Sequence, residues 1–117
     1  MRTLHNLHTV DVGPGEIGVT ARNGTKWSNS EDGERNSIHE EIVLCECLNN
    51  EHKVVGSAII EQVWLGQFQD IPAKFIEQEH ELSSRYYTGL LSSMRRAYGE
   101  DFSENSPITI LAYRRIT

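Results

Sequence analysis

The sequence predicts a small α+β domain that is mainly β, with a strongly bent sheet and helices beside it. Two stretches rich in β-branched and apolar residues, 41–47 and 53–64, are separated by a short polar segment, which is typical of a β-hairpin. Apolar residues then recur at helical spacing before Gly99, which is a natural helix stop. A last apolar stretch, 108–116, follows Pro107 and predicts a closing strand.

Length and composition favour one domain over residues 1–117. A chain of 117 residues can bury a core without disulfides or a structural metal, and the hydrophobic share of 38% predicts that this core is compact. No apolar stretch is long enough to span a bilayer, and the first residues lack the apolar centre of a signal peptide. We therefore expect no membrane association and a cytoplasmic protein.

The net charge of −6 argues against a protein that coats nucleic acid non-specifically, because phosphate neutralisation supplies much of that affinity. It leaves room for a small concave site with local positive charge, since the net charge of a chain says little about one pocket.

The first predicted strand covers 18–22 and lies between two turns. Pro14, which has a glycine on each side, marks the turn before it, and Asn23-Gly24 marks the turn after it. Residues 1–16 show no strong period. Residues 28–39 are polar and rich in turn formers, and they predict a solvated loop that either closes over a neighbouring cleft or has no role.

The hairpin and helices follow from local signals. Gly56 and Ser57 in the second hairpin strand predict a bulge, a device that curls a sheet into a barrel. Pro72 predicts a helix over 73–79, and Ser83 or Ser84 caps a second helix that runs to about residue 98. That helix has one apolar face, formed by Tyr87, Leu90, Leu91, Met94 and Tyr98. The closing strand is expected beside the 18–22 strand, with the helices on an end or a side of the bent sheet.

The cysteines and histidines predict no metal site and no cofactor. Cys45 and Cys47 are two residues apart on a predicted strand, so they share a face but are poorly spaced for a disulfide. His39 and His52 flank the two cysteines and can in principle add metal ligands. The favoured interpretation is that the cysteines are reduced and act as small apolar residues of the core. The five histidines do not show the sequence spacing of metal ligands: His5, His8, His39, His52 and His80.

The stretch 15–27 carries the candidate site. It places a hydroxyl at Thr20, a guanidinium at Arg22, an ammonium at Lys26 and an indole at Trp27. Arginine suits phosphate or carboxylate because its guanidinium offers a planar fork of donors, and aromatic faces bind nucleobases by stacking. We therefore predict that Arg22 and Lys26 hold phosphate, that Trp27 stacks on a base and that Thr20 contacts the ligand.

Each of these residues also has a structural interpretation. Thr20 can be an ordinary strand residue, Arg22 can pair with Glu77 or Glu79, Lys26 can be a solvated charge and Trp27 can belong to the core. Two basic doublets are individually expected to be solvated, although together they can mark a nucleic-acid face: Arg95-Arg96 and Arg114-Arg115.

The order of these segments resembles that of the ASCH domain, a branch of the PUA-like fold, over nearly the whole chain. The family signature is Gly, any residue, Lys, two residues, Glu or Thr, any residue, Arg. Gly15, Thr20 and Arg22 match it, whereas Ile17 stands at the lysine position. The family also tends to carry a pair of acids before its long helix, and 77–80 (Glu-Gln-Glu-His) is similar to it.

The resemblance implies a small bent barrel of five or six strands, with two or more helices flanking a cleft. PUA-like domains commonly bind RNA, and some ASCH members are similar to amidohydrolases that act on N4-acetylcytidine. Carried over by position, Thr20 is then the nucleophile and Glu79 the acid/base carboxylate. Because Ile17 cannot accept a proton, Lys26 is the nearest replacement for the missing lysine.

The residues and the resemblance together leave three functions open. The first is binding of RNA or a nucleotide in a cleft beside residues 15–26. The second is an amidohydrolase that uses Thr20, Glu79 and Lys26. The third is a non-catalytic domain whose acidic surface meets a protein partner. The sequence does not identify the ligand or the oligomeric state.

Overall fold

The fold is organised around one long strand, β4 (Glu51–Gln67), of 17 residues. Its first half pairs antiparallel with β3 (Glu41–Leu48), and its second half pairs antiparallel with β5 (Pro107–Arg115). The register shifts once in each pairing, which bends a strand and increases its twist. The computed structural model describes residues 2–7, 12–24, 27, 38–48, 51–79 and 84–117.

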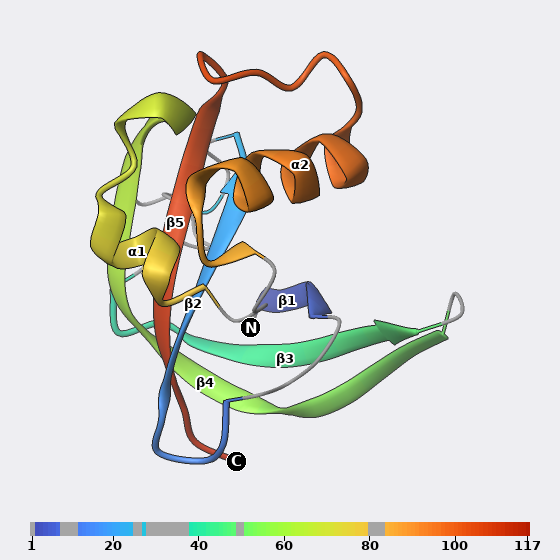
Figure 1. Cartoon of the computed structure of the whole chain (residues 1–117). Helices are drawn as coiled ribbons and strands as arrows, with labels where there is room; N and C mark the ends of the chain where they lie inside the picture. Colours follow the sequence, from blue (N-terminus) through green and yellow to red (C-terminus); the bar gives the residue numbers. More distant parts are fainter. Residues whose placement is uncertain (1, 8–11, 25–26, 28–37, 49–50, 80–83) are drawn as a thin grey trace.

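Two further strands complete a mixed sheet. β2 (Ile17–Asn23) lies antiparallel to β5, as predicted for the 18–22 strand, and β1 (Arg2–Leu7) lies parallel to β3. The order of the five strands is β1-β3-β4-β5-β2 (Figure 1). The prediction of a mainly β, α+β domain is confirmed. β1 was not predicted, because residues 1–16 carry no clear two-residue alternation.

The prediction of a closed barrel is wrong, because the sheet is open. Among the described residues, strand pairing ends at β1 on one edge and at β2 on the other. Closure would require the backbones of these two strands to pair. Instead, Glu79 forms an isolated parallel bridge with Val19 of β2, and the Arg22 side chain donates to the backbone carbonyl of His5 in β1. Other groups therefore cover the edges between which a barrel would close.

The helical elements cover one face of the sheet. A 3-10 turn, η2 (Phe68–Asp70), follows β4 and leads to α1 (Ala73–Glu77) and then to α2 (Tyr87–Tyr98) (Figure 1). Neither α-helix in the described part of the chain is long and apolar enough to cross a membrane. The buried residues on this face form one apolar cluster, called here the helix-side cluster: Val19, Ala21, Phe68, Ile71, Phe75, Ile76, Leu90, Met94, Phe102, Ile108, Ile110 and Ala112.

A second apolar cluster lies on the opposite face of the sheet. It contains Leu4 of β1, which is fully buried, and Tyr113 of β5, which is 1% exposed. We call it the strand-side cluster, and its buried members are Leu4, Val12, Ile42, Leu44, Ala58, Ile60, Leu111 and Tyr113.

Among the element bounds that differ from the predictions, three change the local structure most. α1 ends at Glu77 and not at residue 79, and the backbone of Glu79 instead bridges to β2. α2 begins at Tyr87 after Tyr86, and no side chain caps it; the Ser84 hydroxyl instead bonds the Ser93 hydroxyl at 2.8 Å, and Ser83 lies outside the described residues. β4 begins at Glu51, within the segment predicted as a hairpin loop.

The predicted bulge near Gly56 is confirmed by the register shift between Leu44 and Cys45 in the β3–β4 pairing. Gly56 also permits a close backbone approach. A Cβ added there would lie 2.1 Å from the carbonyl oxygen of Thr117, so the chain end can rest against β4 only where no side chain stands.

Candidate functional site

The alternation of β2 separates its residues between the two faces of the sheet. Val19 and Ala21 join the helix-side cluster, so Gly18, Thr20 and Arg22 face the other way. This placement agrees with Tyr113, whose Cζ would lie only 2.5 Å from a Cβ added at Gly18. Thr20 is 1% exposed and Arg22 is 9% exposed, so both polar side chains lie inside the protein on the strand side.

Arg22 has several polar neighbours. Its Nη1 donates a hydrogen bond of 2.5 Å to the His5 carbonyl oxygen, and its side chain is hydrogen-bonded to Tyr98. Its Nε is buried and has no hydrogen-bond partner among the described residues. Burial of the guanidinium lowers the pKa of Arg22, and the charge of Glu79 partly offsets this by favouring the cation.

Glu79 lies beside the edge strand β2 and interacts with Arg22. Its side chain is 3% exposed and interacts electrostatically with both Arg22 and Tyr113. Its backbone is held by the bridge to Val19 and by the Arg85 Nε, which donates to the Glu79 carbonyl at 2.8 Å. The structure thus brings together a guanidinium and a carboxylate that are 57 residues apart in sequence (79 − 22 = 57).

Tyr113 of β5 is buried next to Arg22 and Glu79 and interacts with both charges. Burial raises the pKa of Tyr113 to about 12, and the nearby charge of Glu79 acts in the same direction. The positive charges of Arg22 and Arg115 act in the opposite direction, but burial has the larger effect. We name Thr20, Arg22, Glu79 and Tyr113 the seam site, because they lie at or beside the edge strand β2 and Arg22 reaches from it to β1.

Trp27 is placed differently from the other predicted ligand-binding residues. Its ring packs against the strand-side cluster, and the Arg2 guanidinium lies 4.4 Å from the ring centroid. Arg2 in turn is paired with Glu40, through Nε to Oε1 at 2.9 Å and Nη2 to Oε2 at 2.5 Å. One face of the indole is therefore covered by a cation. Lys26 and His80 lie outside the described residues, as does most of the polar loop (28–37).

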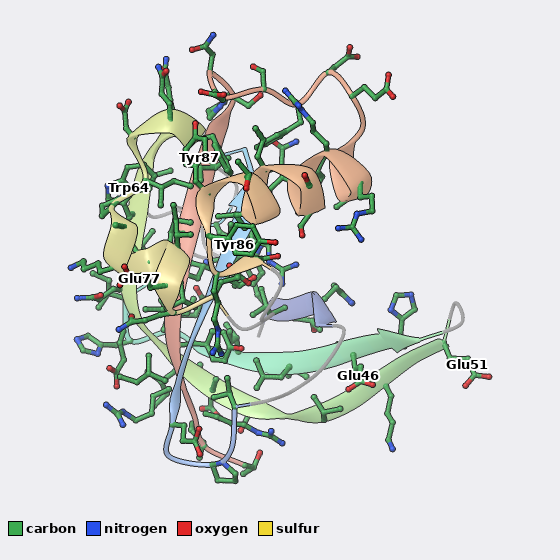
Figure 2. All side chains as sticks on the ribbon, viewed as in Figure 1. Glu46, Glu51, Trp64, Glu77, Tyr86 and Tyr87 are labelled. Atoms are coloured by element: carbon green, nitrogen blue, oxygen red, sulfur yellow. The ribbon has the colours of Figure 1, made fainter. Side chains whose placement is uncertain are left out.

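Two exposed tyrosines near the seam site were not predicted to bind ligand. Tyr98 was placed on the apolar face of its helix, but it is 42% exposed and hydrogen-bonds Arg22. Tyr86 precedes α2 and is 59% exposed; Figure 2 shows it beside α2, on the side that faces β1 in this view. The signal that could have found Tyr98 is its position in the last turn of the helix, just before Gly99, where an apolar stripe leaves the core.

Ile17, at the lysine position of the family signature, lies elsewhere. It is 48% exposed and lines a shallow hollow of about 390 Å³ with Lys74, Phe75 and Gln78 among others. This hollow lies beside α1, whereas Thr20 points to the opposite face of β2. The residue at the lysine position therefore does not share a pocket with Thr20.

The two basic doublets mostly serve structure. Arg115 donates to the backbone carbonyls of Thr117, Val12 and Val55 at 2.6–2.8 Å. Arg114 forms an exposed salt bridge with Glu61 at 2.6 Å. On α2, Arg95 donates to the Phe102 carbonyl at 3.1 Å. These contacts do not collect the arginines into one patch.

One group of possible metal ligands occurs in the described part of the chain. His5 of β1, Cys45 of β3 and His52 of β4 place ligand atoms within 4.8 Å of one another. The Cys45 Sγ lies 4.0 Å from the His52 Nδ1, and the two imidazole rings meet edge to face with centroids 5.5 Å apart.

Comparison with known proteins shows a fold and no family. No family model matches the sequence, and no curated protein matches it significantly. Among solved structures, the chain is similar to protein EF3133 from Enterococcus faecalis V583, a DUF984 protein, with a TM-score of 0.52 and 10% identity. The similarity covers 87% of this chain and 65% of the EF3133 chain. At this identity the likeness concerns the fold alone.

Proposed function

We propose that this chain is a divergent ASCH-like domain of the PUA-like fold and that it binds a nucleotide, free or within single-stranded RNA, at the seam site. The observation that carries the proposal is the Nε of Arg22, a buried donor without an acceptor among the described residues. Buried donors in folded proteins almost always have a partner, so an orphaned one calls for a missing water or ligand oxygen. A ligand phosphate or base carbonyl supplies that acceptor.

The surroundings of Arg22 favour a ligand with both a polar edge and an aromatic face. Thr20 offers a buried hydroxyl on the strand face of Arg22, and Glu79 offers a buried carboxylate that interacts with Arg22; both suit the donors and acceptors of a base edge. Tyr98 is hydrogen-bonded to Arg22 and is 42% exposed, so its ring joins the buried guanidinium to the protein surface. Tyr98 and Tyr86 replace Trp27 as the proposed stacking residues, because Arg2 covers one face of the Trp27 indole.

The charge distribution limits the ligand to a small one. The net charge is −6, and the arginines of the two basic doublets do not form one patch. A long nucleic acid needs many phosphate contacts, whereas one or a few nucleotides need only the local charge of Arg22. We therefore propose a mononucleotide or a short unpaired segment.

Hydrolysis of an N4-acetylated cytidine at this site is the less favoured proposal. Thr20 needs a base beside it to act as a nucleophile. Ile17 cannot serve and lies on the other face of β2, and Lys26 lies outside the described residues. Acetate release from N4-acetylcytidine that disappears in Thr20→Val would establish this activity in place of simple binding.

The binding proposal is tested by isothermal titration calorimetry. The protein is titrated with cytidine 5′-monophosphate and, separately, with a single-stranded pyrimidine hexaribonucleotide. Arg22→Lys keeps the positive charge but removes the Nε and the planar fork, so the affinity for both probes is expected to fall at least tenfold. Arg96→Lys makes the same chemical change at an exposed position of α2 and is the matched control. Circular dichroism verifies that both variants are folded.

Three results would overturn the proposal. The first is unchanged affinity in folded Arg22→Lys. The second is wild-type protein that binds neither probe at millimolar concentration. The third is an equal loss in Arg22→Lys and Arg96→Lys, which would show that the probes bind guanidinium groups wherever these lie and not a site at Arg22.

A further inference from the structure

We propose that His5, Cys45 and His52 form a zinc-binding site, separate from the seam site and independent of the proposed function. The three side chains come from three neighbouring strands, β1, β3 and β4. Two imidazoles and one thiol are the donor set that zinc takes in proteins. Their ligand atoms already lie within 4.8 Å of one another.

The separations are close to those that a metal ion requires. Zinc binds sulfur at about 2.3 Å and nitrogen at about 2.0–2.1 Å in a tetrahedral arrangement, so two ligand atoms are expected roughly 3.3–3.6 Å apart. The Cys45 Sγ and His52 Nδ1 are 4.0 Å apart. Small rotamer changes close this difference, since both histidines are exposed and only Cys45 is buried.

The sheet is irregular where these residues meet. In the β1–β3 pairing the register shifts between Leu4 and Leu7, which brackets His5, and in the β3–β4 pairing it shifts between Leu44 and Cys45. Register irregularities re-aim side chains and are frequent beside functional sites. Both register shifts lie close to His5 and Cys45, in the strands that carry the proposed zinc ligands.

The position in the molecule also suits an accessible ion. The β3–β4 hairpin extends away from the helices, and Figure 2 shows Glu46 and Glu51 along it. Glu46 follows Cys45 in the strand and so points to the opposite face. Among the described side chains the set offers three protein donors, which leaves one tetrahedral position for a further ligand such as water, as in catalytic zinc sites.

The site connects to the seam site through one backbone group. The carbonyl oxygen of His5 accepts the hydrogen bond from Arg22 Nη1 at 2.5 Å. This contact fixes the β1 backbone that carries the first proposed ligand. The two proposals remain separable, because the zinc donors are side chains of β1, β3 and β4 and none belongs to the seam site.

The test is a titration of metal-free protein with Co²⁺ and then Zn²⁺, under reducing conditions. We expect one ion per chain, a thiolate-to-cobalt charge-transfer band, and visible bands of tetrahedral intensity that vanish when Zn²⁺ displaces Co²⁺. Each of His5→Ala and His52→Ala should weaken zinc binding at least tenfold. These positions are exposed, so both variants should fold; Cys45→Ser should abolish the charge-transfer band.

His39→Ala is the matched control, since His39 is also exposed and lies before β3 and outside the cluster. It is expected to bind zinc as the wild type does. The proposal is overturned if the wild type binds no zinc, if Cys45→Ser keeps the charge-transfer band, or if His52→Ala binds as tightly as His39→Ala. The first of these results would leave an ordinary thiol–imidazole contact at 4.0 Å.

Discussion

The two faces of the sheet are packed in different ways. The helix-side cluster is apolar and contains Phe68, whose ring meets the rings of Tyr87 and Phe102 edge to face at 5.2 and 5.7 Å. The strand side buries charge as well, because Arg22 and Glu79 lie there among apolar residues. Apolar burial stabilises a fold roughly in proportion to area, whereas buried charges lose hydration that their attraction only partly restores.

The proposed function gives the two faces separate tasks. The apolar packing of both clusters is expected to supply the stability. The buried guanidinium and carboxylate on the strand side are expected to contribute little to it, which agrees with the proposed binding role. Three experiments test this division, beginning with the largest expected effect.

Phe68→Ala should have the largest effect on stability and none on binding. Phe68 is fully buried, and its removal leaves a cavity between the rings it contacts. The free energy of unfolding is expected to fall by about 3–5 kcal/mol, measured by urea unfolding. Phe68→Leu refills part of the cavity and should lose less. The affinity of the folded protein for cytidine 5′-monophosphate should stay unchanged, and a parallel loss would contradict the division between the faces.

Tyr113 should make stability depend on pH in the alkaline range. Its pKa is about 12 in the folded protein and 10.0 when unperturbed, so the unfolded chain loses this proton first as pH rises. The stabilisation is therefore complete below pH 10 and is lost as pH rises toward 12. The change in unfolding free energy is about 2–3 kcal/mol over this window.

Comparison of the wild type with Tyr113→Phe isolates this effect. The variant should lose less stability than the wild type between pH 10 and 12. Ultraviolet titration of the phenols should lose its most alkaline transition. If both proteins show the same pH dependence, the strand side does not hold Tyr113 in the environment described.

The predictability of the fold and of the site differed for physical reasons. Hydrophobic alternation and turn signals located β2, β3, β4 and β5, because these are local patterns. β1 was missed because residues 1–16 carry no clear two-residue alternation, and its parallel pairing with β3 (Arg2 beside Ile42) leaves no local mark in the sequence. The open edge of the sheet was also beyond prediction, since Glu79 covers β2 through a tertiary contact.

The same distinction applies to the candidate sites. Thr20 and Arg22 were named because they match the signature, and Glu79 because it belongs to the acid pair before the long helix; the structure gathers Arg22 and Glu79 into one buried group. The cluster of His5, Cys45 and His52 has no spacing rule along the chain, because its members lie on three strands. The exposure of Tyr98 depends on where α2 leaves the core, and the only local sign of this is its position just before Gly99.

The smallest expected change in stability comes from replacing both charges of the seam site together. Arg22→Met with Glu79→Met removes the buried cation and anion but keeps similar shapes, and apolar replacement of a buried pair is often neutral or stabilising. We expect the free energy of unfolding to stay within about 1 kcal/mol of the wild type or to rise. Binding of cytidine 5′-monophosphate should be lost in the same protein.

The single variants supply the control for this pair. Arg22→Met alone leaves the Glu79 carboxylate buried without its arginine and should destabilise by about 3–5 kcal/mol. The double variant should recover most of that loss, because the two sites interact and their effects are not additive. If the double variant is instead less stable than either single one, the two charges stabilise the fold. The strand side would then resemble the helix side in its task, and the argument for a ligand at Arg22 would lose its energetic basis.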